Sequence, residues 1–224
     1  MATFWELLLN FFFPLQCVNC GRLLAADNKD RICGDCLSRI IYLNRPIDIR
    51  LSLDRIWSVA VYDGVLKELI HQFKYKEKKY LANSLGKLLV DFVEKYLKEE
   101  RFDYIVPIPL EKARQKKRGY NQAELLARIL GEAVDKPILT NLVERRKKTK
   151  PQFGLNREER FENLAGAFEI SKSGEQNISI IAGKTVLLLD DLATTGATLN
   201  ECARVFKEAG VSEVYGLVLA HGIF

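Results

Sequence analysis

The 224-residue chain carries 34 Lys and Arg against 29 Asp and Glu, and 48% of its residues are hydrophobic. This length accommodates one α/β domain with a small extra module, and the apolar content supports a real core, which excludes a disordered chain. The formal net charge of +5 suits an anionic ligand or nucleic acid, but it is too small to establish either.

The first sixteen residues are apolar and aromatic, with Glu6, Asn10 and Pro14 as interruptions. They lack the basic start and the small-residue cleavage site of a signal peptide, and the uninterrupted run is too short to span a bilayer. We therefore expect a cytoplasmic protein whose N-terminal helix packs on the domain behind it. Peripheral contact with a membrane or a partner is the alternative.

Four cysteines follow as two C-x2-C pairs that are separated by twelve residues. Two such pairs can supply four thiolates in a tetrahedron, which makes a structural Zn²⁺ site without an open position for catalysis. The alternatives are disulfides, disfavoured without a secretion signal, and a redox-active pair, disfavoured by the second matching pair. The predicted zinc ligands are Cys17, Cys20, Cys33 and Cys36. We expect residues 1–50 to hold the N-terminal helix and this module, ahead of a domain over residues 51–224.

The rest of the chain alternates apolar runs with segments of helical spacing, which predicts an α/β fold with a parallel sheet. The apolar runs that predict strands cover residues 56–62, 104–109, 186–189 and 214–219. Helical spacing of apolar residues predicts helices over residues 66–73, 80–98, 122–130 and 199–209. Residues 171–184 are expected to form a loop.

A basic segment, residues 111–122, joins a predicted strand to the start of a helix. Backbone N–H groups at a helix start attract anions, so this segment is a candidate anion site. A solvated basic turn is the alternative. The candidate anion-binding residues are Arg114, Lys116, Lys117, Arg118 and Gly119.

A second candidate site is the stretch 186–199, in which four apolar residues lead into Asp190 and Asp191 and then into a Thr/Gly loop and a helix. Open α/β sheets bind ligands at this end of a strand, and the helix start and Gly196 suit a phosphate. Two carboxylates beside a phosphate make sense if they hold sugar hydroxyls or reach the ligand through Mg²⁺. The predicted phosphate-binding loop consists of Ala193, Thr194, Thr195, Gly196, Ala197 and Thr198.

Two local expectations accompany this stretch. Thr198 and Glu201 fit a capping box at the start of the helix. The acidic pair is expected at the end of the strand, outside the core, so that substituting either carboxylate leaves stability nearly unchanged. Since adjacent strand residues point to opposite sides, Asp190 and Asp191 should not be equivalent.

The stretch 186–198 resembles the phosphoribosyl pyrophosphate (PRPP) signature of type I phosphoribosyltransferases. The resemblance implies a type I phosphoribosyltransferase fold, with a central, mainly parallel sheet flanked by helices. It implies that Asp190 and Asp191 are the catalytic residues that hold the ribose, that the 193–198 loop binds the 5′-phosphate, and that Mg²⁺ accompanies PRPP. The basic segment stands where the family has its pyrophosphate loop. Residues 144–168 stand where the family has a mobile flap, although an ordinary charged connection is the alternative.

The whole chain is similar to ComF-type proteins, which combine a four-cysteine module with a phosphoribosyltransferase-like domain. The resemblance rests on Pro-Ile-Pro-Leu at 107–110, Arg-Gly-Tyr-Asn-Gln at 118–122, Thr-Lys-Pro-Gln at 149–152 and Asn-Leu-Ala-Gly-Ala-Phe at 163–168. Some proteins of this type are needed for DNA uptake in bacterial natural transformation. The implied partners are PRPP, single-stranded DNA and DNA-uptake proteins such as a competence helicase.

Two function classes stay open at this point. The first is an enzyme that transfers phosphoribose to an unidentified acceptor with release of pyrophosphate. The second is a non-catalytic accessory module that senses PRPP or binds single-stranded DNA. The full signature favours the first. The second is favoured because only five residues follow the last predicted strand, so a base-selecting hood is absent unless residues 1–50 replace it. Basic clusters at 112–118 and 145–150 could contact DNA phosphates, but no stripe of aromatic residues is interleaved with them in the sequence.

Overall fold

The computed structural model describes residues 14–222, except residues 29, 45, 48–51, 77, 147–155 and 177. The predicted N-terminal helix and the centre of the predicted flap lie outside these described residues. Among the described residues, no helix combines the length and the apolar character that are needed to cross a bilayer.

Four parallel strands form the central sheet in the order β1-β6-β5-β2. Their bounds are β1 (Arg55–Val61), β2 (Tyr104–Pro107), β5 (Thr185–Ala193) and β6 (Glu213–His221). The central strands β5 and β6 are covered on both faces, which explains why their sequences are continuous apolar runs and not alternating ones. The predicted α/β fold with a parallel sheet is confirmed.

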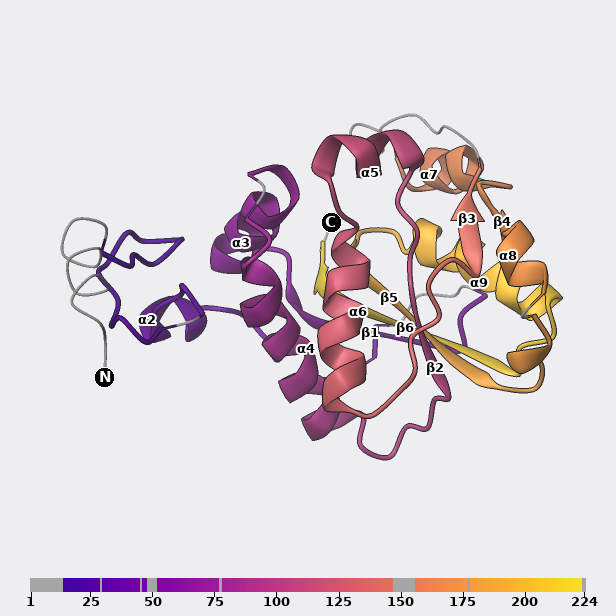
Figure 1. Cartoon of the computed structure of the whole chain (residues 1–224), viewed down its shortest axis with the longest axis horizontal. Coiled ribbons are helices and arrows are strands. Elements are labelled where there is room, and N and C mark those ends of the chain that lie inside the picture. Colours follow the sequence, from indigo (N-terminus) through magenta and orange to yellow (C-terminus); the bar gives the residue numbers. More distant parts are fainter. Residues whose placement is uncertain are drawn as a thin grey trace.

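Helices cover both faces of this sheet and divide the core into two layers (Figure 1). The helices that pack against the first face are α3 (Gly64–Tyr75), α4 (Leu81–Tyr96) and α6 (Gln122–Ala133). The elements on the second face are α9 (Ala197–Glu208), α7 (Arg157–Leu164), β3 (Val143–Arg145) and β4 (Phe168–Ile170), of which β3 and β4 pair antiparallel. Along β5, Leu187 and Leu189 belong to the first layer, while Val186 and Leu188 belong to the second.

Several element boundaries differ from the prediction. The basic segment is not a loop, because residues 112–118 form a separate helix, α5 (Lys112–Arg118), which ends at Gly119 with φ of 76°. Residues predicted as a loop before the signature strand contain two short helical turns, α8 (Lys172–Glu175) and η1 (Ile178–Ile180). Strand β5 runs through both acidic residues to Ala193, whereas the sequence analysis placed the end of the strand at the acidic pair.

The four-cysteine module, residues 14–44 with the short helix α2 (Gly34–Leu37), lies at one end of the molecule beside α3 (Figure 1). Packing and hydrogen bonds to α3 and α4, in addition to the covalent connection, hold the module in place. Buried Ile32 and three of the four cysteines belong to the same hydrophobic cluster as the inner side chains of α3 and α4. The side chain of Gln72 donates to the carbonyl of Val18 at 3.0 Å, and Ser84 donates to the carbonyl of Asp30 at 2.5 Å. The module is therefore packed onto the helices of the first layer.

Candidate functional site

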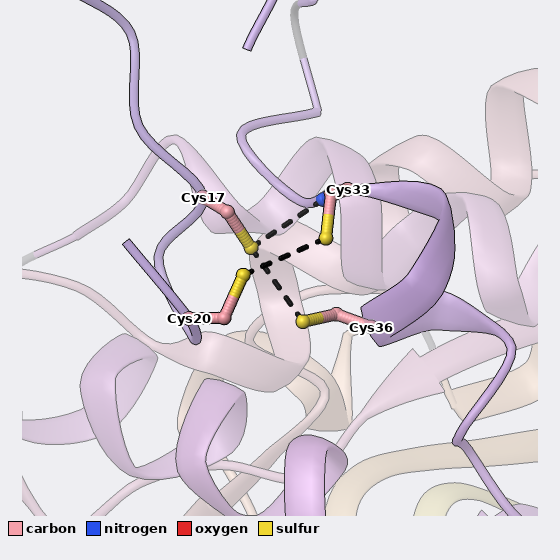
Figure 2. A group of neighbouring side chains, drawn as sticks. All are labelled: Cys17, Cys20, Cys33 and Cys36. Carbon is pink, nitrogen blue, oxygen red and sulfur yellow. Dashed lines mark hydrogen bonds between the residues drawn. The ribbon is translucent and has the colours of Figure 1, made fainter. Parts of the chain in front are cut away.

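The four predicted zinc ligands converge on one point, as Figure 2 shows. All four Sγ atoms lie within 4.8 Å of one another, and the Cys17–Cys36 and Cys20–Cys33 sulfur pairs are 3.7 Å apart. A tetrahedron with Zn–S bonds of about 2.3 Å has sulfur–sulfur edges of about 3.8 Å, whereas a disulfide bond is about 2.05 Å. The geometry therefore fits a four-thiolate zinc site and does not fit the disulfide alternative.

Donors from the surrounding chain support negative charge on these sulfur atoms. Asn19 Nδ2 and Arg39 Nη2 donate to Cys36 Sγ at 3.3 and 3.2 Å. Burial opposes ionisation of Cys17, but backbone N–H groups at Cys20, Cys33 and Asn19 outweigh it and lower the pKa of Cys17 to about 6. Cys33 differs, because the backbone N–H of Cys36 lowers its pKa but burial and hydrogen bonds with the other three thiols outweigh this and raise it to about 11. Since zinc binds thiolates and not thiols, the lowered pKa of Cys17 favours metal binding near neutral pH, whereas Cys33 must lose its proton as the metal binds.

The acidic pair lies inside strand β5 and not at its end, so the expectation of an acidic pair outside the core is wrong. The two carboxylates take opposite environments because adjacent strand residues face opposite layers. Asp191 is buried, and its Oδ1 forms an ion pair with Lys74 Nζ of α3 at 2.7 Å. Asp190 is half-buried and lines a pocket with residues 192–199.

The charges of this pair are strongly perturbed. Burial, followed by repulsion from Asp191, raises the pKa of Asp190 to about 7, although Lys74 opposes the shift. Burial lowers the pKa of Lys74, but attraction by Asp191 and Asp190 outweighs it, and the net pKa is above the usual value. Lys74 is therefore charged at neutral pH and pairs with Asp191, while Asp190, whose Oδ1 accepts the backbone N–H of Asp191, faces the pocket.

The predicted phosphate loop forms one wall of this pocket. Gly196 adopts φ of 76°, a left-handed conformation that favours glycine, and it directly precedes α9. The backbone N–H groups of the first turn of α9 have no partner within the helix, and they lie at the positive end of its dipole. All six predicted phosphate-binding residues are thus brought together around one helix N-terminus.

The capping interaction predicted at Thr198 and Glu201 is wrong, because α9 begins two residues earlier than predicted, at Ala197, with Gly196 as its N-cap. Glu201 instead accepts the backbone N–H of Gly166 at 2.8 Å and pairs with Arg204. A capping box does occur at the start of α7, where the side chains of Asn156 and Glu159 accept from each other's backbone N–H groups. The spacing of polar residues in the sequence therefore did not show that the capping box is at the start of α7 and not at the start of α9.

Helix α7 delivers Arg160 to the phosphate loop. Its Nη1 donates to Thr194 Oγ1 at 2.7 Å, so a guanidinium lies directly beside the loop. The sequence analysis did not single out Arg160, because it lies within the charged stretch taken as a flap or a connection. The Asn-x-x-Glu pattern before it was the available signal, since it fixes the start of α7 and hence the face that carries Arg160.

The structure separates the five candidate residues of the basic segment into two groups. Lys116, Lys117 and Gly119 are exposed, whereas Arg114 and Arg118 are half-buried on the same face of α5. Arg118 donates to Gln122 at 2.7 Å, and its guanidinium lies 5.1 Å from the centre of the Tyr75 ring. The side of α5 that carries Arg114 and Arg118 is therefore the side that packs on its neighbours.

Arg145 was grouped with a basic cluster at 145–150 that could contact DNA, but its side chain is buried. It lies over the Phe168 ring at 5.6 Å, in the field of Arg114, Glu111 and Asp190. Burial, reinforced by Arg114, lowers its pKa below the usual value for arginine. Arg145 thus belongs to the surroundings of the acidic pair and is not a surface contact; residues 147–150 lie outside the described residues.

Comparisons with known proteins agree with this geometry. The family described as phosphoribosyl transferase domain matches residues 86–222. Competence protein F of Haemophilus influenzae is 34% identical, over 93% of this chain and 99% of its own length. Competence protein ComFC of Bacillus subtilis is 31% identical over 87% of this chain and 72% of its own length. DNA utilization protein YhgH of Escherichia coli K12 is 29% identical over 88% of this chain and 80% of its own length.

Zinc content should depend on the four-cysteine cluster and not on cysteine as such. Protein purified under reducing conditions should contain about one Zn²⁺ per chain, and Cys17→Ser should lose it because three thiolates hold zinc far more weakly. Cys202→Ser is the matched control, since Cys202 is a buried cysteine of α9 outside the cluster. Elemental analysis of the three proteins decides; equal zinc in wild type and Cys17→Ser would contradict the site.

Substituting the two carboxylates should change stability in opposite directions. Asp191→Asn leaves the buried Lys74 without its partner and should cost up to roughly 3 kcal/mol. Asp190→Asn should instead stabilise the folded state at pH 8. The folded pKa of Asp190, about 7, is above its unfolded value, so ionised Asp190 opposes folding. This cost is absent below about pH 4, grows as the pH rises to 7, and is complete above it.

Thermal unfolding without ligand or Mg²⁺, at pH 5 and pH 8, measures both effects. The gain from Asp190→Asn, roughly 1–2 kcal/mol after allowance for its partial exposure, should shrink at pH 5. Asp35→Asn is the control, because Asp35 pairs with Arg22 on the exposed surface and should change little. If Asp191→Asn proves as harmless as Asp35→Asn, the buried ion pair is wrong.

Proposed function

Because this chain belongs to the phosphoribosyl transferase family and, with its four-cysteine module, to the ComF-type proteins, we propose that it binds PRPP together with Mg²⁺. The observation that carries the proposal is the pocket in which Asp190 faces the start of α9. The pocket offers a carboxylate for sugar hydroxyls beside a helix N-terminus for a phosphate. PRPP joins these two groups in one molecule.

In this proposal different residues around the pocket bind different parts of PRPP. The loop 193–198 binds the 5′-phosphate, and Arg160, which already contacts Thr194, adds a positive charge beside it. Asp190 accepts hydrogen bonds from the ribose hydroxyls. Arg114 and Arg118 are the better candidates for binding the pyrophosphate, because they lie on the inward face of α5. The other three candidates, Lys116, Lys117 and Gly119, are exposed.

The residues present also fit Mg²⁺, since Asp190 is a half-buried carboxylate in a pocket proposed to receive phosphates. Proteins usually hold Mg²⁺ by one or two carboxylates plus the phosphates of the substrate. When bound, the ion would neutralise charge on the leaving pyrophosphate. The chain's own residues would fix the ribose and both phosphate groups around C1, which orients that carbon for displacement.

Transfer of phosphoribose is the reaction that this arrangement supports best, with an acceptor that we leave open. The two alternatives are an active transferase and a module that binds PRPP without chemistry. We propose further that residues 1–50 form the zinc-binding part and residues 51–224 the PRPP-binding part. Release of pyrophosphate, measured with nucleobases, ammonia or DNA ends as acceptors, distinguishes the active enzyme from the binding module.

Calorimetric titration of PRPP with Mg²⁺ tests the proposed site. Asp190→Asn should weaken binding roughly ten- to a hundredfold, because a charge-assisted hydrogen bond is worth about 1.5–3 kcal/mol. Gly196→Val should be worse, because a side chain at φ of 76° strains the loop and blocks its approach to the phosphate. Thr185→Val, at the opposite end of β5, is the control and should bind as wild type does. Wild-type protein that shows no binding at millimolar PRPP would overturn the proposal.

A second proposed function, the handling of single-stranded DNA, is favoured by a surface around the turn between α3 and α4. Here three tyrosine rings each lie under a basic group. Arg118 covers Tyr75 at 5.1 Å, Arg31 covers Tyr80 at 5.3 Å, and Lys79 covers Tyr120 at 5.1 Å. We call these six residues the aromatic–basic surface, in which the Tyr120 ring is buried beneath Lys79 and the other two rings are exposed. Tyr75 and Tyr80 are 64% and 41% exposed, so their rings are accessible to a base.

Rings for stacking combined with cations for phosphates are the two elements of single-strand binding surfaces. The sequence contained no aromatic stripe within the basic clusters, but folding supplies one by placing α5 beside the end of α3. The similar proteins named for competence and DNA utilization support a role in DNA uptake. None of the five cysteines is in a disulfide bond, which supports the expected cytoplasmic location, where competence proteins such as a helicase would be partners.

Fluorescence anisotropy with a labelled single-stranded oligonucleotide at low salt tests this surface. Tyr75→Ala and Tyr80→Ala should each weaken binding roughly fivefold or more, because stacking on one ring is worth about 1–3 kcal/mol. Tyr96→Ala is a matched control, since Tyr96 is also exposed beside a lysine, Lys95, but lies at the far end of α4. Equal losses in all three variants, or no binding by wild type, would contradict the proposal.

A further inference from the structure

The last turn of α3 contacts three parts of the molecule, namely the four-cysteine module, the end of α5 and strand β5, through four consecutive residues. Gln72 donates to Val18 of the four-cysteine module at 3.0 Å, and the carbonyl of Phe73 accepts the hydroxyl of Tyr120. Lys74 pairs with Asp191, and the Tyr75 ring lies under Arg118. These contacts fix the position of the turn from several directions. The Lys74 side chain is therefore held against β5 by more than its own ion pair.

Lys74 is an unusual residue to bury. Its side chain is only 15% exposed and that of Asp191 only 7%. Removing two charges from water costs several kcal/mol per ion, and their attraction often does no more than offset that cost. The pair is therefore a weak source of net stability. The pair lies next to Asp190, which lines the pocket, so its effect on the site is electrostatic and positional.

The ion pair changes both the charge and the geometry of the acidic pair. Without Lys74 the buried carboxylate of Asp191 would be an uncompensated negative charge one residue from Asp190, which lines the pocket; with Lys74, the charge of Asp191 is compensated. The backbone N–H of Asp191 also donates to Asp190 Oδ1 at 2.8 Å, so the placement of Asp191 orients the neighbouring carboxylate. Lys74 thereby acts on Asp190 through Asp191.

We propose that Lys74 is a positioning residue of the PRPP site, which cancels the charge of Asp191 and leaves Asp190 as the single carboxylate offered to the ligand. This inference rests on the proposed binding of PRPP. It assigns the two acidic residues different tasks: Asp190 contacts the sugar, while Asp191 holds Lys74 and orients Asp190. A residue from α3, outside the signature and the basic segment, is then part of the ligand site.

The test compares PRPP affinity in wild type, Lys74→Met, the double variant Lys74→Met with Asp191→Asn, and Lys76→Met. Titrations with Mg²⁺ are run far below the lowest melting temperature of the set, so that every protein is folded. Lys74→Met should weaken binding roughly tenfold or more, because Asp191 is left as an uncompensated charge beside the ligand. The double variant removes both charges at similar volume and should recover affinity to within about threefold of wild type.

Lys76→Met is the matched control, because Lys76 lies two residues further along at an exposed position, 3.9 Å from Glu68. It should bind PRPP as wild type does. Normal affinity in Lys74→Met overturns the inference. A double variant as weak as Lys74→Met also overturns it, since Lys74 would then act on the ligand directly and not through Asp191. Failure of wild type to bind PRPP would instead overturn the proposed function itself, so the two failures are distinguishable.

Discussion

Strand β5 imposes the constraint on which the rest of the site depends. It is central in the sheet and covered on both faces, so every side chain along it must enter one of two packed layers. Two acidic residues in such a strand cannot both reach solvent on the same side. Asp191 enters the layer of α3 and needs a buried cation, whereas Asp190 enters the layer of α9, where the helix start opens a pocket. The inequality of the two carboxylates is a direct consequence of the sheet.

This constraint gives α3 a larger role than its sequence suggests. Its inner side chains share one hydrophobic cluster with the four-cysteine module, and its last turn contacts both that module and β5. A closed four-thiolate site has no position for a substrate, so the module can act on the proposed site only through packing. By bracing α3, the module supports the element that carries Lys74. The module and the pocket are thus connected through packing, without a shared ligand.

The two proposed functions meet at the same residues. Arg118 lies over Tyr75 on the aromatic–basic surface, and it also stands on the face of α5 proposed to bind pyrophosphate. Tyr75 follows Lys74 directly in the chain. A bound nucleic acid and a bound PRPP would therefore both act on the position of Arg118. The two proposals therefore share one residue, Arg118.

Much of this protein could be derived from the sequence because the relevant signals are local. The spacing of two C-x2-C pairs predicts a four-thiolate cluster, since short knuckles bring each pair together without help from distant residues. The apolar run followed by acids, a Thr/Gly loop and a helix predicts the pocket loop, because strand, turn and helix start are all encoded within fifteen or so neighbouring residues. The alternation of such units gave the parallel α/β fold.

What only the tertiary structure decided are the pairings between segments far apart in the chain. Lys74 with Asp191, Arg160 with Thr194, and Arg118 over Tyr75 depend on how α3, α7 and α5 pack, and no periodicity encodes them. The end of β5 was also set by its neighbour: β6 pairs with it through Ala193, so the acids became part of the strand. Local spacing specifies elements, but the partner of a buried charge is chosen by packing, because only packing removes water from it.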